Sequence, residues 1–198
     1  MNDILWLLVS FLYILVVLLA ACCMGRSGVQ AIFVRKTVHI LVSLWIFIMA
    51  YGMESPAARL IGPVLFTVLN LAFYIHSGNI SAGIVFFPLS ITVLIFLMIE
   101  GILSVQAVVA GTLVMGLGDG AAAIAGTLLG KTRKSIEGSA VMFIVAFNVI
   151  LACTGIGVIR ASVSALAATV VERISPSALD NLAVPLLAAG AVEVLCAL

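Results

Sequence analysis

Long apolar runs recur along the whole chain and limit its fold more than any other feature of the sequence. A helix needs about 20 predominantly apolar residues to cross a hydrocarbon core of roughly 30 Å. Runs approaching this length make up most of the 198 residues, of which 65% are hydrophobic and 9% charged. Soluble domains carry about 25% charged residues. The sequence therefore predicts an all-α, polytopic bundle of transmembrane helices.

Seven or eight spans fit this apolar pattern, and the distribution of charge favours eight. The segment 140–171 is long for one span and short for two, although Gly155 and Gly157 offer a turn within it. The segment 121–129 either continues the fifth span or lies along the membrane interface. The eight predicted spans are 4–24, 38–53, 57–75, 82–99, 103–117, 140–154, 158–171 and 182–198.

Lysine and arginine predict the orientation, because they concentrate in short cytoplasmic loops. With eight spans, seven of the nine lysine and arginine residues fall on one side of the membrane, which is then the cytoplasmic side, and only Arg59 and Arg160 fall on the outer side. Both termini are then outside, and the chain is predicted to be an integral protein of the cytoplasmic (inner) membrane. The basic residues assigned to the cytoplasmic side are Arg26, Arg35, Lys36, Lys131, Arg133, Lys134 and Arg173.

The sizeable polar interruptions all fall on the predicted cytoplasmic side. They are 25–36, 76–81, 131–139 and 172–181. No linker or charge block divides the chain, so we expect one domain over 1–198, with the first helix 4–24 as an anchor added to a core of about 35–187. The polar chemistry should therefore gather at one membrane boundary.

These interruptions carry residue types that suit a nucleoside triphosphate with Mg²⁺. Arg35 and His39 are four residues apart, on one helical face. Asp119 lies among glycines, near the inner boundary, and cations follow it at Lys131 and Lys134. Cations and exposed backbone N–H groups bind phosphate oxygens, while carboxylates hold the metal. Phosphoryl transfer needs mainly such positioning and charge stabilisation.

Simpler interpretations apply to most of these residues taken singly. The glycine pairs at 116/120 and 126/130 have the GxxxG spacing of closely packed helices. The cations of 131–134 are also typical of a topology signal or a lipid-headgroup patch. His39 or His76 taken alone is typical of a hydrogen-bonding residue at the membrane interface. Asp119 differs, since a carboxylate at membrane depth is costly and usually functional.

Three motifs follow one another along the chain. RKTVH at 35–39 has the pattern RKxxH, GDGAAAIAGTLLG at 118–130 followed by KSIEGS at 134–139 has the pattern GDxxAxxxGxxxG…KSxEGS, and DNLAVP at 180–185 is close to DNLTVP. In this order they resemble the motifs of the CTP-dependent polyprenol kinase family, which includes phytol kinases, dolichol kinases and a CTP-using diacylglycerol kinase. Ala183 departs from the usual threonine, and the chain is much smaller than dolichol kinases.

The resemblance implies transfer of the γ-phosphate of CTP to the hydroxyl of a membrane lipid alcohol, with a divalent cation, on the cytoplasmic side. It matches Asp119 to the family's central acid, and beside this match we expect Lys36, His39, Glu172 and Asp180 as further catalytic candidates. Mg²⁺ is expected at Asp119 with Glu137 or Asp180. The expected nucleotide-binding residues are Arg35, Lys36, Gly118, Gly120, Gly126, Gly130, Lys131, Lys134, Ser135, Glu137, Gly138 and Asn181. His39, Glu172 and Asp180 stay open as the group that orients or deprotonates the alcohol.

The expected partners are CTP, the lipid alcohol and the bilayer, with no nucleic acid; an isoprenoid alcohol such as phytol or a polyprenol is favoured. The alternatives left open are a CTP-dependent diacylglycerol kinase, a cytidylyltransferase that forms a CDP-lipid and releases pyrophosphate, and, more distantly, a transporter. A transporter would place polar residues near the midplane. A CDP-alcohol phosphotransferase needs an arginine and regularly spaced aspartates, which 121–125 lack.

Overall fold

The computed structural model describes residues 3–78 and 80–198, and within them every regular element is a helix. This confirms the predicted all-α class. The helices are α1 Asp3–Arg26, α2 Ala31–Leu44, α3 Ile46–Gly52, α4 Pro56–Ser77, α5 Gly83–Ile99, α6 Val105–Leu113, the π-helical η1 Val114–Asp119, α7 Gly120–Leu128, α8 Ile136–Thr154, α9 Val158–Ile174 and α10 Asp180–Ala197.

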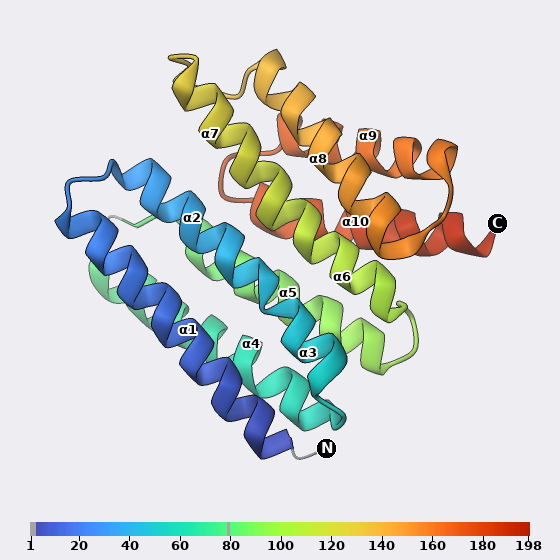
Figure 1. Ribbon diagram of the computed structural model, residues 1–198, viewed down its shortest axis with the longest axis horizontal. Helices are drawn as coiled ribbons and strands as arrows, with labels where there is room; N and C mark the ends of the chain where they lie inside the picture. Colours follow the sequence, from blue (N-terminus) through green and yellow to red (C-terminus); the bar gives the residue numbers. More distant parts are fainter. Residues whose placement is uncertain (1–2, 79) are drawn as a thin grey trace.

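Successive helical rods run antiparallel through the bundle (Figure 1). α2 and α3 form one rod with a bend at Trp45, and α6, η1 and α7 form another. The doubtful segment 140–171 lies in two helices, α8 and α9. Gly155 (φ +65°) and Gly157 (φ +86°) make the turn between them in a backbone conformation that side chains disfavour.

The rod from α6 to α7 is the centre of the bundle. In its most apolar stretch 78% of the residues are buried, against 11–39% in the other long apolar helices. α2, α8 and α10 pack around it. The segment 121–129 therefore continues the fifth predicted span, mostly as α7, and does not lie apart from it. Asp119 is on this central rod, so neighbouring helices surround it.

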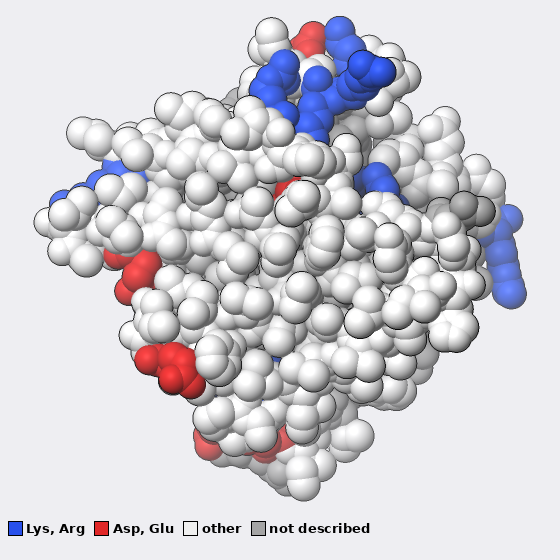
Figure 2. Space-filling view, turned by 180° about the vertical axis from the view of Figure 1, so that it is seen from behind, with Lys and Arg blue, Asp and Glu red and all other residues white. Residues whose placement is uncertain are grey.

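Counting α2 with α3 as one rod and α6, η1 and α7 as another, six helical rods among the described residues are long and apolar enough to cross a membrane, and α5 is a shorter apolar helix. α9 has 17 residues and carries Arg160, Glu172 and Arg173. Figure 2 shows a broad uncharged band across one face, with the densest group of lysine and arginine at one end and acidic side chains at the opposite end. The protein therefore has the helices and surface of an integral membrane protein.

Hydrogen bonds join the helices at the end of the bundle where α1 begins. The carboxylate of Asp3 accepts from the backbone N–H groups of Glu54 (2.9 Å) and Ser55 (3.1 Å). Glu193, near the end of α10, accepts from the N–H (2.7 Å) and hydroxyl (2.6 Å) of Ser104. Ser104 in turn caps α6. Glu193 thus has a structural role at the end of α6, away from Asp119 at the far end of that rod.

Glycines let the central rod approach its neighbours. A Cβ atom at Gly116 would lie 2.1 Å from the hydroxyl of Ser43, and one at Gly120 would lie 2.7 Å from Ile40, both on α2. Close packing therefore accounts for the 116/120 pair. Gly126 and Gly130 have no such neighbour, so packing does not explain the second pair.

Gly111→Ala is expected to destabilise the bundle. A Cβ there would lie 2.6 Å from the backbone carbonyl of Pro185 in α10, which cannot move aside as a side chain would. Overpacking of this kind costs about 1–3 kcal/mol. Gly190→Ala is the matched control, because a Cβ added at Gly190 on α10 would have no neighbouring atom within 4 Å. Thermal unfolding in detergent should show a lower Tm for the first variant only; equal Tm values would contradict the packing.

Candidate functional site

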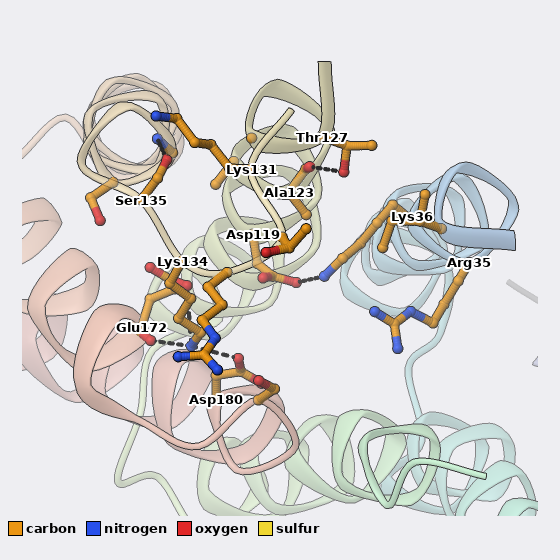
Figure 3. Close-up of a pocket in the computed structure, with 18 residues that line it drawn as sticks. Arg35, Lys36, Asp119, Ala123, Thr127, Lys131, Lys134, Ser135, Glu172 and Asp180 are labelled. Atoms are coloured by element: carbon orange, nitrogen blue, oxygen red, sulfur yellow. Dashed lines mark hydrogen bonds and ion pairs between the residues drawn. The ribbon is translucent and has the colours of Figure 1, made fainter. Parts of the chain in front are cut away.

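A cavity of about 200 Å³ lies at the end of the bundle where the polar loops meet (Figure 3). α2 and α7 supply one side, and the loop before α8 and the segment between α9 and α10 supply the other. Its lining residues are Ile32, Arg35, Lys36, Asp119, Ala122, Ala123, Gly126, Thr127, Lys131, Thr132, Arg133, Lys134, Ser135, Gly138, Ser139, Glu172, Ser177 and Asp180. Three of the four polar interruptions thus line one cavity.

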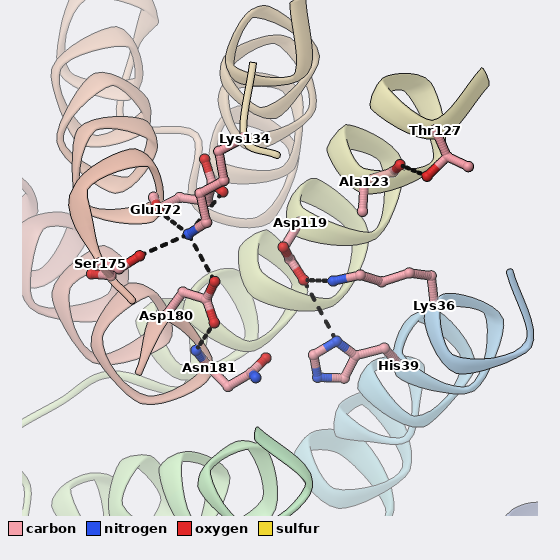
Figure 4. A network of polar contacts seen from close by, with 10 residues as sticks. All are labelled: Lys36, His39, Asp119, Ala123, Thr127, Lys134, Glu172, Ser175, Asp180 and Asn181. Carbon is pink, nitrogen blue, oxygen red and sulfur yellow. Dashed lines mark hydrogen bonds and ion pairs between the residues drawn. The ribbon is translucent and has the colours of Figure 1, made fainter. Parts of the chain in front are cut away.

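Asp119 pairs with the two polar residues of α2 that face it. Its Oδ2 accepts a short hydrogen bond from the Nζ of Lys36 and lies 3.7 Å from the Nδ1 of His39 (Figure 4). Lys36 and Asp119 are both buried. Because Gly116 and Gly120 bring the central rod against α2, the carboxylate reaches residues that lie about 80 positions earlier in the chain.

Lys134 joins the opposite side of the cavity. Its Nζ donates to Asp180 Oδ2 (2.8 Å) and the Ser175 carbonyl (3.1 Å), makes a short hydrogen bond to the Glu172 carbonyl, and lies 3.2 Å from Glu172 Oε1. Burial alone lowers the pKa of Lys134, but the hydrogen bond to Asp180 and the charges of Asp180 and Glu172 outweigh it and hold the pKa above the ordinary value. The side chain therefore stays cationic at neutral pH.

Three buried carboxylates, from Asp119, Glu172 and Asp180, converge on the cavity. One oxygen of each lies within 4.8 Å of the others. Hard carboxylate oxygens at this spacing suit Mg²⁺, which is usually held by one or two carboxylates together with substrate phosphates and water. The sequence predicts this role for Asp119 and Asp180. Glu172 completes the group in place of Glu137, whose side chain is 49% exposed and pairs with Lys131 at 3.3 Å.

The cavity is positive overall. Among the described residues its lining carries five cationic side chains, those of Arg35, Lys36, Lys131, Arg133 and Lys134, and three carboxylates. Figure 3 shows Lys36 and Arg35 entering from α2, with Lys134, Glu172 and Asp180 opposite. A divalent cation would raise the excess of positive charge from two to four. Such an excess suits a polyphosphate ligand.

The structure brings most, but not all, of the predicted site residues to this cavity. Gly118 does not line it, because a Cβ there would meet the sulfur of Met142 at 2.6 Å. Gly120 packs on α2, and Gly130 (φ +70°) forms the turn after α7. His39 and Asn181 line a neighbouring cavity. The predicted residues that line the cavity are Arg35, Lys36, Asp119, Gly126, Lys131, Lys134, Ser135, Gly138, Glu172 and Asp180.

Several lining residues lie outside the predicted set. Arg133 stands between two predicted residues, so the cluster of cations at 131–134 was an available signal for it. Ser177 belongs to 172–181, one of the four polar interruptions, and this position was the only signal for it in the sequence. Thr127 lines the cavity beside Gly126, and its hydroxyl donates to the carbonyl of Ala123 (2.8 Å); its sequence context is that of any apolar helix.

Comparisons with protein-family models, with curated proteins and with solved structures found no match to this chain.

Proposed function

We propose that the protein is a lipid-alcohol kinase of the CTP-dependent polyprenol kinase family. The observation that supports this most directly is the cavity in which five cations and three buried carboxylates meet at one end of an apolar bundle. A polyphosphate needs the cations, and a metal ion needs the acids. A lipid acceptor needs the bilayer beside them. The resemblance of 35–39, 118–139 and 180–185 to the family's motifs names CTP as the donor.

We also propose that the chain crosses the inner membrane eight times with both termini outside. The antiparallel order of the rods supports this number, although α9 is short and carries charges. The surplus of lysine and arginine around the cavity favours the cytoplasmic side for that end. A nucleotide reaches this end from the cytoplasm, while a lipid alcohol reaches it within the bilayer.

In this proposal the basic residues hold the triphosphate and stabilise the charge that develops during transfer. Arg35 and Lys36 act from α2, and Lys131, Arg133 and Lys134 from the loop before α8. Gly126 leaves the wall of α7 open beside them, and Ser135 and Gly138 line the start of α8. The N-terminus of α8 adds a partial positive charge that favours phosphate.

Asp119, Glu172 and Asp180 would hold the divalent cation. When bound, such an ion neutralises phosphate oxygens and fixes their orientation. In the structure Lys36 pairs with Asp119 and Lys134 with Asp180. These pairs balance the buried charges and hold the lysines at the cavity wall. From there each lysine can turn to a phosphate group, and each carboxylate to the metal ion. Removing either member leaves a buried charge without its partner, which is strongly unfavourable.

The proposal is tested by incubating the purified protein with a lipid alcohol, Mg²⁺ and CTP or ATP labelled at the γ- or the α-phosphate. A kinase transfers only the γ-label to the lipid and releases CDP or ADP. A cytidylyltransferase transfers the α-label to a phospholipid and releases pyrophosphate. Label that enters no lipid under any of these conditions would refute the proposed activity. Diacylglycerol belongs in the acceptor panel, because a diacylglycerol kinase is the nearest alternative.

A further inference from the structure

A second cavity, of about 330 Å³, adjoins the first and has a different lining. α1, α2, the middle of α4, the start of α5 and the segment 177–181 enclose it. Arg35, Lys36 and Ser177 line both cavities, so the two share a wall. The other lining residues are Leu18, Val38, His39, Val42, Phe66, Asn70, Ser81, Gly83, Ile84, Phe87, Pro88 and Asn181.

This lining is mostly apolar, with polar side chains at the shared wall and at Asn70 and Ser81. The polar side chains beside the shared wall are those of His39 and Asn181. Asn181 is buried, and its side-chain carbonyl has no hydrogen-bond partner among the residues that the structure describes. A buried polar group without a partner is unfavourable and calls for an explanation; this one borders a cavity in which a ligand's hydroxyl could donate to it. The apolar wall reaches Leu18, which is 47% exposed on the outer surface of α1.

We propose that this second cavity binds the acceptor, and that the acceptor is a single-chain lipid alcohol. The inference rests on the proposed kinase function. The hydroxyl would lie at the shared wall, and the chain would run along the apolar lining and leave past Leu18 into the bilayer. The volume is at the small end of the roughly 300–1,000 Å³ usual for small-molecule pockets, so the part of the acceptor inside it fits the hydroxyl end of one chain better than the glycerol backbone of a diacylglycerol with two chains attached.

His39 is placed to take the proton of that hydroxyl. Its Nδ1 faces Asp119, its ring packs edge-on against Phe87 at 3.9 Å between centroids, and it lines the second cavity. In the transfer step the hydroxyl oxygen forms a bond to the γ-phosphorus and its proton passes to Nε2 of His39, since Nδ1 faces Asp119. The bond from the γ-phosphorus to the bridging oxygen breaks, and the nucleoside diphosphate leaves with that electron pair. Asp119 stabilises the imidazolium that results.

The site is tested first without turnover, by photocrosslinking. A long single-chain isoprenoid alcohol that carries a diazirine is added to the full-length protein in lipid nanodiscs. We expect labelled peptides from 35–42, 66–70 and 81–88, with labelling that excess unlabelled alcohol removes and excess diacylglycerol does not. Labelling confined to other surfaces, or removed equally well by diacylglycerol, would overturn the inference. This result does not depend on whether phosphate is transferred.

Val42→Trp then tests the cavity in the reaction. Filling the cavity should lower kcat/KM for the alcohol about 100-fold, since small displacements of a reacting group have effects of this size. Nucleotide affinity should stay unchanged, because Val42 does not line the first cavity. Val170→Trp is the control, since Val170 lies exposed on α9 and lines neither cavity. Equal kcat/KM values for the two variants and the native protein would overturn the inference.

His39→Gln separates proton transfer from binding. We expect transfer to the alcohol to fall about 100-fold, with crosslinking of the alcohol and nucleotide affinity retained. An undiminished rate would remove His39 from the mechanism. If crosslinking labels the second cavity but no acceptor is ever phosphorylated, the lipid site stands and the kinase function fails. If phosphate is transferred but the cavity is never labelled, the kinase function stands and the lipid site fails.

Discussion

Asp119→Asn is expected to abolish phosphoryl transfer, with a loss of at least about 100-fold in kcat. The asparagine has nearly the same size as the aspartate and its carbonyl still accepts from Lys36, but the buried Lys36 loses its counter-charge, so we expect a folded protein with a lower Tm, assayed below that Tm. It removes the charge that the metal ion and His39 both require. The measurement is transfer of γ-label to a lipid alcohol at saturating nucleotide, together with the Tm in detergent.

Glu193→Gln is the matched control for this change. It makes the same exchange of carboxylate for amide, but at the other end of the central rod, where Glu193 caps α6 through Ser104. We expect it to lower the Tm slightly and to leave kcat unchanged. If Asp119→Asn were as active as the native protein while Glu193→Gln was inactive, the cavity around Asp119 would not be the active site.

The helices could be predicted from the sequence because each apolar run is close to membrane length. The turn at 155–157 and the continuation of the fifth span into α7 could not be settled in this way. They depend on which side of a helix meets its neighbours, and apolar composition is nearly uniform around these helices. The positions of most helices could therefore be predicted from the sequence more easily than the side on which each helix packs against its neighbours.

The candidate site shows the same division. The predicted topology places Lys36 and Asp119 at the same membrane boundary, but nothing in their spacing predicts a direct contact across 83 positions. The motif also predicts Gly118 at the nucleotide, but Gly118, within the π-helical η1, faces the sulfur of Met142. The metal ligands expected from the sequence include Glu137 and leave out Glu172. The start of α8 leaves Glu137 at the surface, while the end of α9 buries Glu172.

Lys134→Met is expected to weaken both the fold and nucleotide binding. The Nζ of Lys134 contacts Glu172, Ser175 and Asp180, so the loop before α8 is joined to α9 and α10 through this one group. Methionine fills similar space but leaves two buried carboxylates without a cation. The expected cost is about 3 kcal/mol, or a Tm lower by roughly 10 °C for a chain of this size.

Lys131→Met separates these two effects, because Lys131 lines the same cavity but, among the residues that the structure describes, pairs only with the exposed Glu137. Exposed ion pairs contribute little to stability, so its Tm should match that of the native protein while nucleotide affinity falls. Thermal unfolding and titration with a fluorescent nucleotide measure the two quantities. A Lys134→Met protein with native Tm and native affinity would contradict both roles of Lys134. Native affinity in both variants would show that the loop before α8 does not hold the phosphates, and the nucleotide would then have to bind through α2 alone.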